Sequence, residues 1–253
     1  MRRMSASPVL LVTGGSRGIG AAICLGAAKA GWRVAVNYAS NRDAADAVVG
    51  AIERAGGTAI AVQGDVGSEA DVQAIFAAVD SAFGRLDGLV NNAGIVGQTA
   101  RVDEMSPERL ERMFRINVTG SMRCAAEAVR RMSTRYGHQG GVIVNISSVA
   151  ATLGSPAQYV DYAASKGAID TFTTGLSREV ATEGIRVNAI RPGIIDTEIH
   201  ASGGLPDRAR DLAFTIPVQR PGTAEEVADA VLYLLSDKAT YVTGAILNVS
   251  GGR

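Results

Sequence analysis

The fold is decided by residues 8–20, which read PVLLVTGGSRGIG. The apolar run Val9–Val12 predicts a buried strand, and the glycines after it predict a tight turn into a helix over about 18–30. Three glycines of this turn let the backbone approach a bound group closely: Gly14, Gly18 and Gly20. The N–H groups at the start of the helix, and the positive end of its dipole, would face a phosphate held there. The stretch therefore predicts a dinucleotide-binding corner.

Short apolar runs alternate with helical patterns along most of the chain. The expected strands are Val9–Val12, Arg33–Asn37, Ala59–Gln63, Gly88–Val90, Val142–Ile146, Arg186–Ile190 and Ile246–Val249. The expected helices span about 18–30, 41–55, 68–83, 106–133, 159–183 and 223–235. Most of these strands are continuously apolar, which is typical of parallel strands covered on both faces. The pattern predicts an α/β fold, a single-domain doubly wound (Rossmann-type) parallel sheet of seven strands with helices on both faces, over residues 1–253. Residues 196–221 follow no clear pattern, and we expect a mobile substrate lid there.

Composition narrows the class of protein. The formal net charge is zero, which gives a nucleic-acid role no electrostatic support. With two cysteines and two histidines, the chain suggests neither a disulfide framework nor a metal site. The chain has no signal-peptide pattern and no apolar run long enough for a membrane span, so we expect a soluble, cytoplasmic protein.

Tyr162 and Lys166 place a phenol and an ammonium one helical turn apart. A partly desolvated ammonium beside a tyrosine stabilises the phenolate and lowers the tyrosine pKa, so that the phenol can exchange a proton with a carbinol oxygen. Taken alone, the pair more often reflects a lysine that reaches solvent. Tyr159 is a rival phenol, but it lies about 10 Å along the helix axis from Lys166.

Polar residues follow two of the expected strands. Ser147 and Ser148 close one strand and Asn91–Gly94 closes another, at the edge where ligands gather in open α/β sheets. Each group is also compatible with ordinary turn chemistry. Asn117 interrupts an otherwise apolar helix face. An asparagine in such a position is more often structural than catalytic.

In this order, the pieces resemble the short-chain dehydrogenase/reductase family, including its 3-oxoacyl-carrier-protein reductase and glucose dehydrogenase-like members. The resemblance covers nearly the whole chain. The matching segments are Thr13–Gly20, Gly64–Val66, Asn91–Gly94, Asn117, Ser147–Ser148, Tyr162–Lys166, Arg191–Gly193 and Val242–Gly252.

The resemblance implies a catalytic tetrad of Asn117, Ser148, Tyr162 and Lys166. Tyr162 would be the general acid/base and Ser148 would orient the substrate oxygen. Lys166 would lower the pKa of Tyr162 and bind the nicotinamide ribose, and Asn117 would hold a water in a proton relay. Ser148 lies one residue further from Tyr162 than is common in the family, so we expect one extra residue in the loop 150–160.

The expected cofactor is a nicotinamide dinucleotide, with NADP(H) preferred over NAD(H). An NAD enzyme would place a carboxylate just after the second strand, and none occurs there before Asp43. Arg17 and Arg42 would attract the 2′-phosphate, although both are also compatible with solvated surface positions. The residues expected to bind the cofactor are Gly14, Ser16, Arg17, Gly18, Ile19, Gly20, Asn37, Ser40, Arg42, Asp65, Val66, Asn92, Ala93, Gly94, Tyr162, Lys166, Pro192, Gly193, Ile195 and Thr197.

The leading hypothesis is an oxidoreductase that interconverts a carbonyl and a secondary alcohol. A 3-oxoacyl-carrier-protein reductase, a glucose-like sugar dehydrogenase and a broad ketone reductase all stay open. A non-catalytic NADP-binding sensor is the alternative from another class, and a methyltransferase explains fewer motifs. Expected pocket residues are Ile95, Val96, Gln98, Leu153 and the segment 200–214. The family resemblance also implies a homotetramer built through the helices at 106–133 and 159–183.

Overall fold

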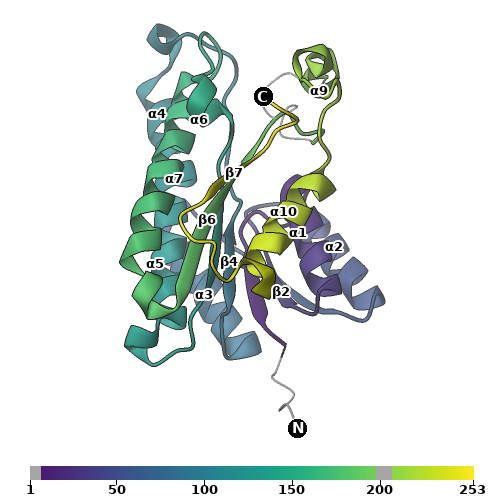
Figure 1. Ribbon diagram of the computed structural model, residues 1–253, viewed down its shortest axis with the longest axis vertical. Helices are drawn as coiled ribbons and strands as arrows, with labels where there is room; N and C mark the ends of the chain where they lie inside the picture. The colour runs from purple at the N-terminus through teal and green to yellow at the C-terminus, as the bar shows by residue number, and fades with distance from the viewer. Residues whose placement is uncertain (1–6, 198–206) are drawn as a thin grey trace.

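One parallel sheet of seven strands forms the centre of the molecule (Figure 1). The computed structural model describes residues 7–197 and 207–253. The strands are β1 (Val9–Val12), β2 (Arg33–Tyr38), β3 (Thr58–Gln63), β4 (Gly88–Asn91), β5 (Gly141–Ile146), β6 (Ile185–Pro192) and β7 (Ile246–Val249). They lie in the order β3-β2-β1-β4-β5-β6-β7. All seven strands expected from the sequence are confirmed, and no strand end differs by more than two residues.

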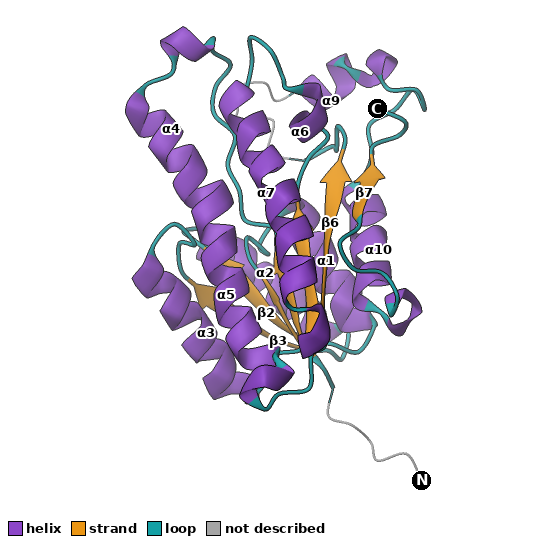
Figure 2. Cartoon of the chain, turned by 60° about the vertical axis from the view of Figure 1, so that its left-hand side comes forward, coloured by secondary structure: helices purple, strands orange, loops and turns teal. Residues whose placement is uncertain are grey.

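Helices cover both faces of the sheet, as Figure 2 shows. The main ones are α1 (Gly18–Lys29), α2 (Arg42–Arg54), α3 (Glu69–Phe83), α4 (Pro107–Phe114), α5 (Ser121–Met132), α7 (Val160–Glu179) and α10 (Ala224–Leu235). Helices α1, α2 and α10 bury apolar side chains against one face, and α3, α5 and α7 cover the other. The fold is therefore a three-layer doubly wound α/β fold, as predicted.

The strand order reverses between β1 and β4, which are neighbours in the sheet with Leu11 in register with Leu89. Crossover connections leave the sheet in opposite directions from this point, so the loops after β1 and β4 diverge and open a crevice at the carboxyl edge. The residues that follow β1, β4, β5 and β6 meet at this edge. It is where the sequence places its glycine-rich and polar motifs.

The long helix expected over 106–133 is interrupted. A π-helical turn at Arg115–Gly120 separates α4 from α5. Here the backbone lies close to the end of β3, because a methyl group on Gly120 would lie 2.8 Å from the Val66 carbonyl oxygen. The wider turn also carries Asn117, whose side chain leaves the helix to bond to the chain after β4. Apolar periodicity alone does not reveal this insertion.

Two short helices were not expected from the sequence: α6 (Ala150–Leu153) and α9 (Arg208–Asp211). Both lie beyond the carboxyl ends of β6 and β7 (Figure 2). The expected lid at 196–221 contains α9 and a 3₁₀ turn at Ala213–Thr215, and its residues 198–206 lie outside the described part of the chain. None of the described helices is both long and apolar enough to cross a membrane.

Candidate active site

The turn after β1 leaves the start of α1 open to a ligand. α2, α3 and α10 each begin with a side-chain cap, from Asn41, Ser68 and Thr223 respectively. The residue before α1 is Arg17, and it makes no side-chain cap to the first turn. The first N–H groups of α1 therefore remain available to an anion.

Glycine is required where α1 packs on this turn. A methyl group on Gly20 would lie 2.3 Å from the Gly14 carbonyl oxygen and 2.6 Å from Asn92 Nδ2. Real side chains do not approach backbone so closely, so Gly20 sets the contact between helix and turn and does not itself line the cleft. Gly20 was expected to bind the cofactor, and the structure places it instead where α1 packs on the turn.

The loops after β1 and β4 are tied together by a compact hydrogen-bond network. Thr13 Oγ1 accepts hydrogen bonds from the backbone N–H groups of Asn92 and Ala93, each at 3.0 Å. Asn92 Nδ2 donates in return to the carbonyl oxygens of Thr13 and Gly14, each at 2.9 Å. The sequence motif at 91–94 therefore fixes one wall of the crevice relative to the glycine turn.

Two connected cavities occupy the crevice, an outer one of about 520 Å³ and an inner one of about 180 Å³. Of the expected site residues, the outer cavity is lined by Gly14, Ser16, Arg17, Gly18, Ile19, Asn37, Ser40, Asp65, Val66, Asn92, Ala93, Gly94 and Thr197. The inner cavity is lined by Ile19, Asn92, Gly94, Ser148, Tyr162, Lys166, Pro192, Gly193, Ile195 and Thr197. Several residues line both cavities and so join them into one cleft: Ile19, Asn92, Gly94 and Thr197. Its open helix start and glycine-lined wall fit a dinucleotide.

Two side chains expected to contact the 2′-phosphate have other partners in the structure. Asn37 lies at the outer cavity, but its side-chain oxygen accepts from Gly14 N–H at 3.2 Å and its amide nitrogen donates to the carbonyls of Val62 and Gly64. Its polar atoms therefore tie the glycine turn to the end of β3. Arg42 does not line the cavity and instead pairs with Asp46 at 3.2 Å, on the exposed surface of α2.

Arg112 lines the outer cavity and was missed from the sequence. It lies on α4, far along the chain from the glycine turn, and only the folded chain brings it to the cleft. Together with Arg17 it gives the outer cavity two guanidinium groups. Asp65 is the acidic residue of the described lining, and its Oδ1 accepts from Gly67 N–H at 2.8 Å.

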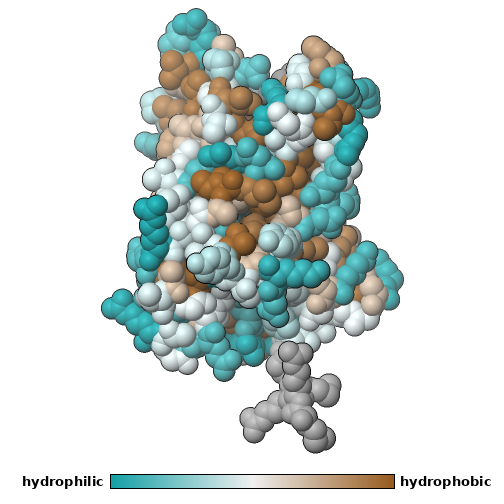
Figure 3. Space-filling model, viewed as in Figure 1, coloured by the Kyte–Doolittle hydropathy of each residue, from teal (hydrophilic) through white to brown (hydrophobic). Residues whose placement is uncertain are grey.

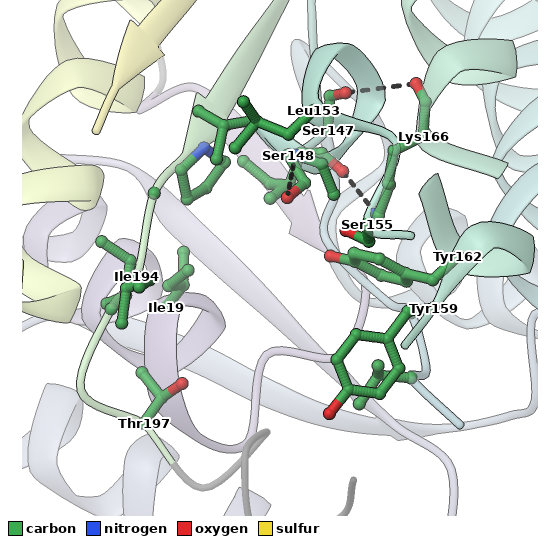
Figure 4. Close-up of a pocket in the computed structure, with 18 of the residues that line it drawn as sticks. Ile19, Ser147, Ser148, Leu153, Ser155, Tyr159, Tyr162, Lys166, Ile194 and Thr197 are labelled. Carbon is green, nitrogen blue, oxygen red and sulfur yellow. Dashed lines mark hydrogen bonds between the residues drawn. The ribbon is translucent and has the colours of Figure 1, made fainter. Parts of the chain in front are cut away.

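Tyr162, Ser148 and Lys166 meet at the inner cavity. The Tyr162 hydroxyl points into the space between α7 and the side chains of Ile19 and Ile194 (Figure 4). Ser148 shares a side-chain hydrogen bond with it. Lys166 Nζ lies 5.6 Å from the centre of the tyrosine ring and donates to the Ile146 carbonyl oxygen at 2.8 Å. The sequence prediction of this constellation is thus matched in space.

The pKa values of the pair differ from the expectation. Burial raises the pKa of Tyr162, and the hydrogen bond with Ser148 opposes this shift only in part. Burial also lowers the pKa of Lys166 to about 8, while the Asp170 carboxylate partly restores it. Burial therefore favours the protonated form of Tyr162, and this direction is opposite to the lowering of its pKa expected from Lys166. At neutral pH the Lys166 side chain is still mostly protonated, so a positive charge lies beside the Tyr162 ring.

The Asn117 side chain is buried, and it forms hydrogen bonds with the protein's own backbone and side chains. Its Oδ1 accepts from Ile95 N–H at 2.8 Å, and its Nδ2 donates to the Ile95 carbonyl at 2.9 Å and to Ser165 Oγ at 3.1 Å. A methyl group on Gly94 would lie 3.4 Å from Asn117 Oδ1 and 3.5 Å from Lys166 Nζ. The asparagine and the ammonium therefore face the same small space, although Asn117 lines neither cavity.

The loop before Tyr162 has an unusual backbone. Ser155 and Ala157 adopt left-handed conformations (φ 46° and 55°), which non-glycine residues rarely take. This is the loop where the sequence comparison with the family implies an extra residue. Ser155 and Tyr159 line the inner cavity, so the loop shapes the pocket next to the tyrosine.

An ion pair that the sequence analysis missed fixes the start of α7. Asp161 is buried, and Arg109 of α4 binds both of its carboxylate oxygens, at 2.8 and 3.1 Å. Arg109 also donates to the Gln98 carbonyl oxygen at 2.7 Å. Gln98 thus supports the pocket wall without lining a cavity, whereas Val96 and Leu153 line the inner cavity as expected. His200 lies outside the described residues.

Comparisons with known proteins agree with this geometry. Residues 14–253 match a family model described as enoyl-(acyl carrier protein) reductase. The chain is 55% identical to the oxidoreductase YgfF of Escherichia coli (strain K12), covering 97% of this chain and 99% of that protein. It is 38% identical to the 3-oxoacyl-[acyl-carrier-protein] reductase FabG of Staphylococcus aureus (strain Mu50 / ATCC 700699), covering 96% of each. It is 40% identical to glucose 1-dehydrogenase 2 of Bacillus subtilis (strain 168), covering 96% and 93%.

Solved structures show the same architecture. A short-chain dehydrogenase/reductase from Serratia marcescens BCRC 10948 superposes with a TM-score of 0.89 at 37% identity, covering 97% of each chain. A short-chain dehydrogenase from Burkholderia cenocepacia J2315, solved in complex with NADP, gives a TM-score of 0.89 at 34% identity over 99% of each chain. From its fold, its cleft and these relatives, the chain belongs to the short-chain dehydrogenase/reductase family and is an NAD(P)-dependent oxidoreductase.

Proposed function

We propose that the protein interconverts a carbonyl and a secondary alcohol with NADP(H), using Tyr162 as the general acid/base. One observation carries the proposal most directly: the Tyr162 hydroxyl faces the inner cavity, with Ser148 as its hydrogen-bond partner and the Lys166 ammonium behind its ring. A nicotinamide ring bound in this cavity would supply or accept the hydride. The remaining chemistry is the movement of one proton, which the chain's own residues provide.

In the reducing direction, Tyr162 donates its proton to the carbonyl oxygen. The raised pKa of Tyr162 keeps that proton in place at neutral pH. Ser148 orients the oxygen, and the Lys166 ammonium stabilises the phenolate left behind. We propose that a water near Asn117 and Lys166 then returns a proton to Tyr162, because both polar groups face the space beside Gly94.

The proposed preference for NADP(H) rests on the outer cavity. Ala39, Ser40 and Asn41 line it after β2, so no carboxylate stands there to repel a 2′-phosphate. Arg17 and Arg112 supply positive charge to the same cavity. The Burkholderia relative was solved with NADP. We expect a higher kcat/KM with NADPH than with NADH, and Arg17→Ala or Arg112→Ala should reduce this ratio. A clear preference for NADH in the wild-type protein would contradict the assignment.

The relatives support a carbonyl or alcohol substrate without choosing among its kinds. One is named a 3-oxoacyl-[acyl-carrier-protein] reductase and another a glucose 1-dehydrogenase. Both activities stay open for this chain. We also propose that the chain forms one catalytic domain that assembles as a homotetramer through α4, α5 and α7.

The test is the loss of NADPH absorbance with a panel of ketones, oxoacyl thioesters and sugar lactones. Tyr162→Phe should lower kcat/KM by about 10²-fold or more while NADPH binding, followed by fluorescence, is retained. Tyr136→Phe is the matched control, because Tyr136 is 54% exposed and lies away from the cleft. Tight NADPH binding without turnover of any substrate would instead favour the NADP-binding sensor.

A further inference from the structure

A buried carboxylate lies one helical turn beyond the proposed acid/base pair. Asp170 follows Lys166 by four residues in α7, so their side chains lie on the same face of the helix. Both are buried, with exposed fractions of 5% for Lys166 and 7% for Asp170. Lys166 lines the inner cavity and Asp170 does not. Asp170 would therefore act on the reaction through Lys166.

Arg191 holds this carboxylate from the neighbouring strand. α7 lies beside β6 (Figure 1), and Arg191 is near the carboxyl end of that strand. Its Nε and Nη2 atoms both donate to Asp170 Oδ2, at 2.9 and 2.8 Å. The next two residues, Pro192 and Gly193, line the inner cavity. The ion pair thus joins the helix of the acid/base pair to the cavity wall.

The ion pair leaves part of the carboxylate unsatisfied. Asp170 Oδ1 is buried and has no hydrogen-bond partner within the described chain. A buried carboxylate oxygen without a partner is costly, so its retention calls for a physical reason. Lys166 offers one, because its ammonium is also buried and its hydrogen bond goes to the neutral Ile146 carbonyl. The Asp170 carboxylate is the negative charge that opposes the effect of burial on Lys166.

Other charged residues on the elements packed against α7 are exposed or already have partners. α6 and β5 contain no charged residue. The others are Arg109 (bound to Asp161), Arg186 (bound to the Val242 and Ser236 carbonyls), Glu183 (bound to Ser133) and the exposed Glu108, Glu111, Arg112 and Arg115. Among the described residues, this leaves Tyr162 and the Asp170–Arg191 pair as the groups whose charge acts most directly on Lys166.

We propose that Asp170 and Arg191 are positioning residues of the active site: Asp170 keeps Lys166 charged, and Arg191 limits this effect by neutralising part of the carboxylate. The inference rests on the proposed function, because a charged Lys166 stabilises the Tyr162 phenolate in that reaction. It gives the two members of one ion pair opposite effects. Without the Asp170 charge Lys166 loses its proton more easily, and without the Arg191 charge it loses it less easily. A pair that only joined α7 to β6 would not act in opposite directions.

Titration of Lys166 by NMR tests this coupling without any substrate. Lysine isotopically labelled at Cε gives one signal for each of Lys29, Lys166 and Lys238, and the Lys166→Met variant identifies the buried one. In Asp170→Asn the Lys166 midpoint should fall by about 0.5 pH unit or more, and in Arg191→Met it should rise. Asp46→Asn is the matched control, because it removes an exposed carboxylate on α2 and should leave the midpoint unchanged.

The pH profile of the reaction tests whether this charge serves catalysis. With NADPH and the most rapidly reduced substrate of the panel, the alkaline limb of kcat/KM should move to lower pH in Asp170→Asn. In Arg191→Met it should move to higher pH. Both directions hold whether the limb belongs to Lys166 or to Tyr162 coupled to it, because a nearby negative charge raises the pKa of either group.

An unchanged Lys166 midpoint in Asp170→Asn would overturn the proposal, and so would midpoints that move in the same direction in both variants. Where Asp170→Asn does not fold, Arg191→Met decides alone, and a midpoint that does not rise overturns the proposal. Midpoints that move as expected while the alkaline limb stays fixed would show that the charge does not serve the reaction, which also overturns the assigned role. If the wild-type protein reduces no substrate of the panel, the proposed function fails, and the NMR titration still decides whether Asp170 holds the charge on Lys166.

Discussion

Lys166 is a buried cation in a chain whose other charges are mostly exposed. Its ammonium donates to the Ile146 carbonyl, and its neighbours include the Tyr162 ring and the Asp170 carboxylate. Asp170 is itself held by Arg191 of β6, at 2.8 Å. Burial lowers the pKa of Lys166 to about 8, well below the 10.5 of an exposed lysine. The site therefore keeps a cation that costs folding stability.

This cost predicts how stability depends on pH. Below pH 8 both the folded and unfolded chains hold the Lys166 proton, and the burial cost is about 3 kcal/mol. Between pH 8 and 10.5 the unfolded chain binds more protons than the folded chain, so this residue's contribution to stability rises with pH. Urea unfolding of the cofactor-free protein should show the wild type gaining about 2–3 kcal/mol relative to Lys166→Met between pH 7 and 10.

The comparison with the Lys166→Met variant is needed because Tyr162 changes the pH dependence of folding stability in the opposite direction. Its raised pKa means that the folded chain keeps the phenol proton after the unfolded chain has lost it, which lowers stability above about pH 10. The difference between wild type and Lys166→Met isolates the lysine as long as the tyrosine is present in both. A free-energy difference that stays flat from pH 7 to 10 would show that Lys166 has an ordinary pKa.

At the scale of elements, α4 and α7 are joined through the wall of the pocket. Arg109 of α4 binds Asp161 in the first turn of α7, one residue before Tyr162, and also holds the Gln98 carbonyl. Asn117 holds the other end of the same wall at Ile95. The segment 95–98 is thus fixed at both ends, next to the proposed acid/base.

Removing this ion pair should destabilise the protein far more than removing an exposed one. Arg109→Met leaves the fully buried Asp161 carboxylate without its cation, and we expect a loss of about 3 kcal/mol or more. Arg42→Met is the matched control, because the Arg42–Asp46 pair is solvent-exposed and should contribute less than about 1 kcal/mol. Urea unfolding at pH 7 measures both losses. Equal effects of the two substitutions would mean that the Arg109–Asp161 pair is not desolvated.

The strands and the Tyr162–Lys166 pair were readable from the sequence because both follow local rules. Buried parallel strands are continuously apolar, and Tyr162 and Lys166 are spaced by one helical turn. The π-helical turn, Arg109 and Arg112 were not readable. Each depends on a contact between segments that are distant in the sequence, such as the contact of Asn117 with Ile95. Such contacts produce no periodic pattern in the sequence. The same limit explains Asn37, whose residue type suits a ligand but whose amide bonds to the glycine turn.

At the scale of the molecule, two parts of the surface carry small or apolar side chains in place of charged ones: the outward side of α7 and the face on which β7 lies. Small residues lie on the outward side of α7, where Ala164, Thr171 and Gly175 are exposed. Figure 3 shows hydrophobic surface across the middle of the face on which β7 lies in Figure 1, and Leu247 of β7 is 40% exposed. Small and apolar surfaces of this kind favour close packing against other copies of the chain.

The α7 surface gives the sharpest test of assembly. Nothing lies within 4 Å of a methyl group built on Gly175, so the single chain has room for a larger side chain there. Light scattering should give the wild-type protein about four times the 26.1 kDa of one chain, and Gly175→Arg should lower this mass because the arginine fills the space that a second helix would need. Gly175→Ala is the matched control: it should keep the assembled mass and stabilise the helix by about 0.5–1 kcal/mol. A wild-type monomer, or an arginine variant that keeps the assembled mass, would mean that copies of the chain do not meet across this face of α7.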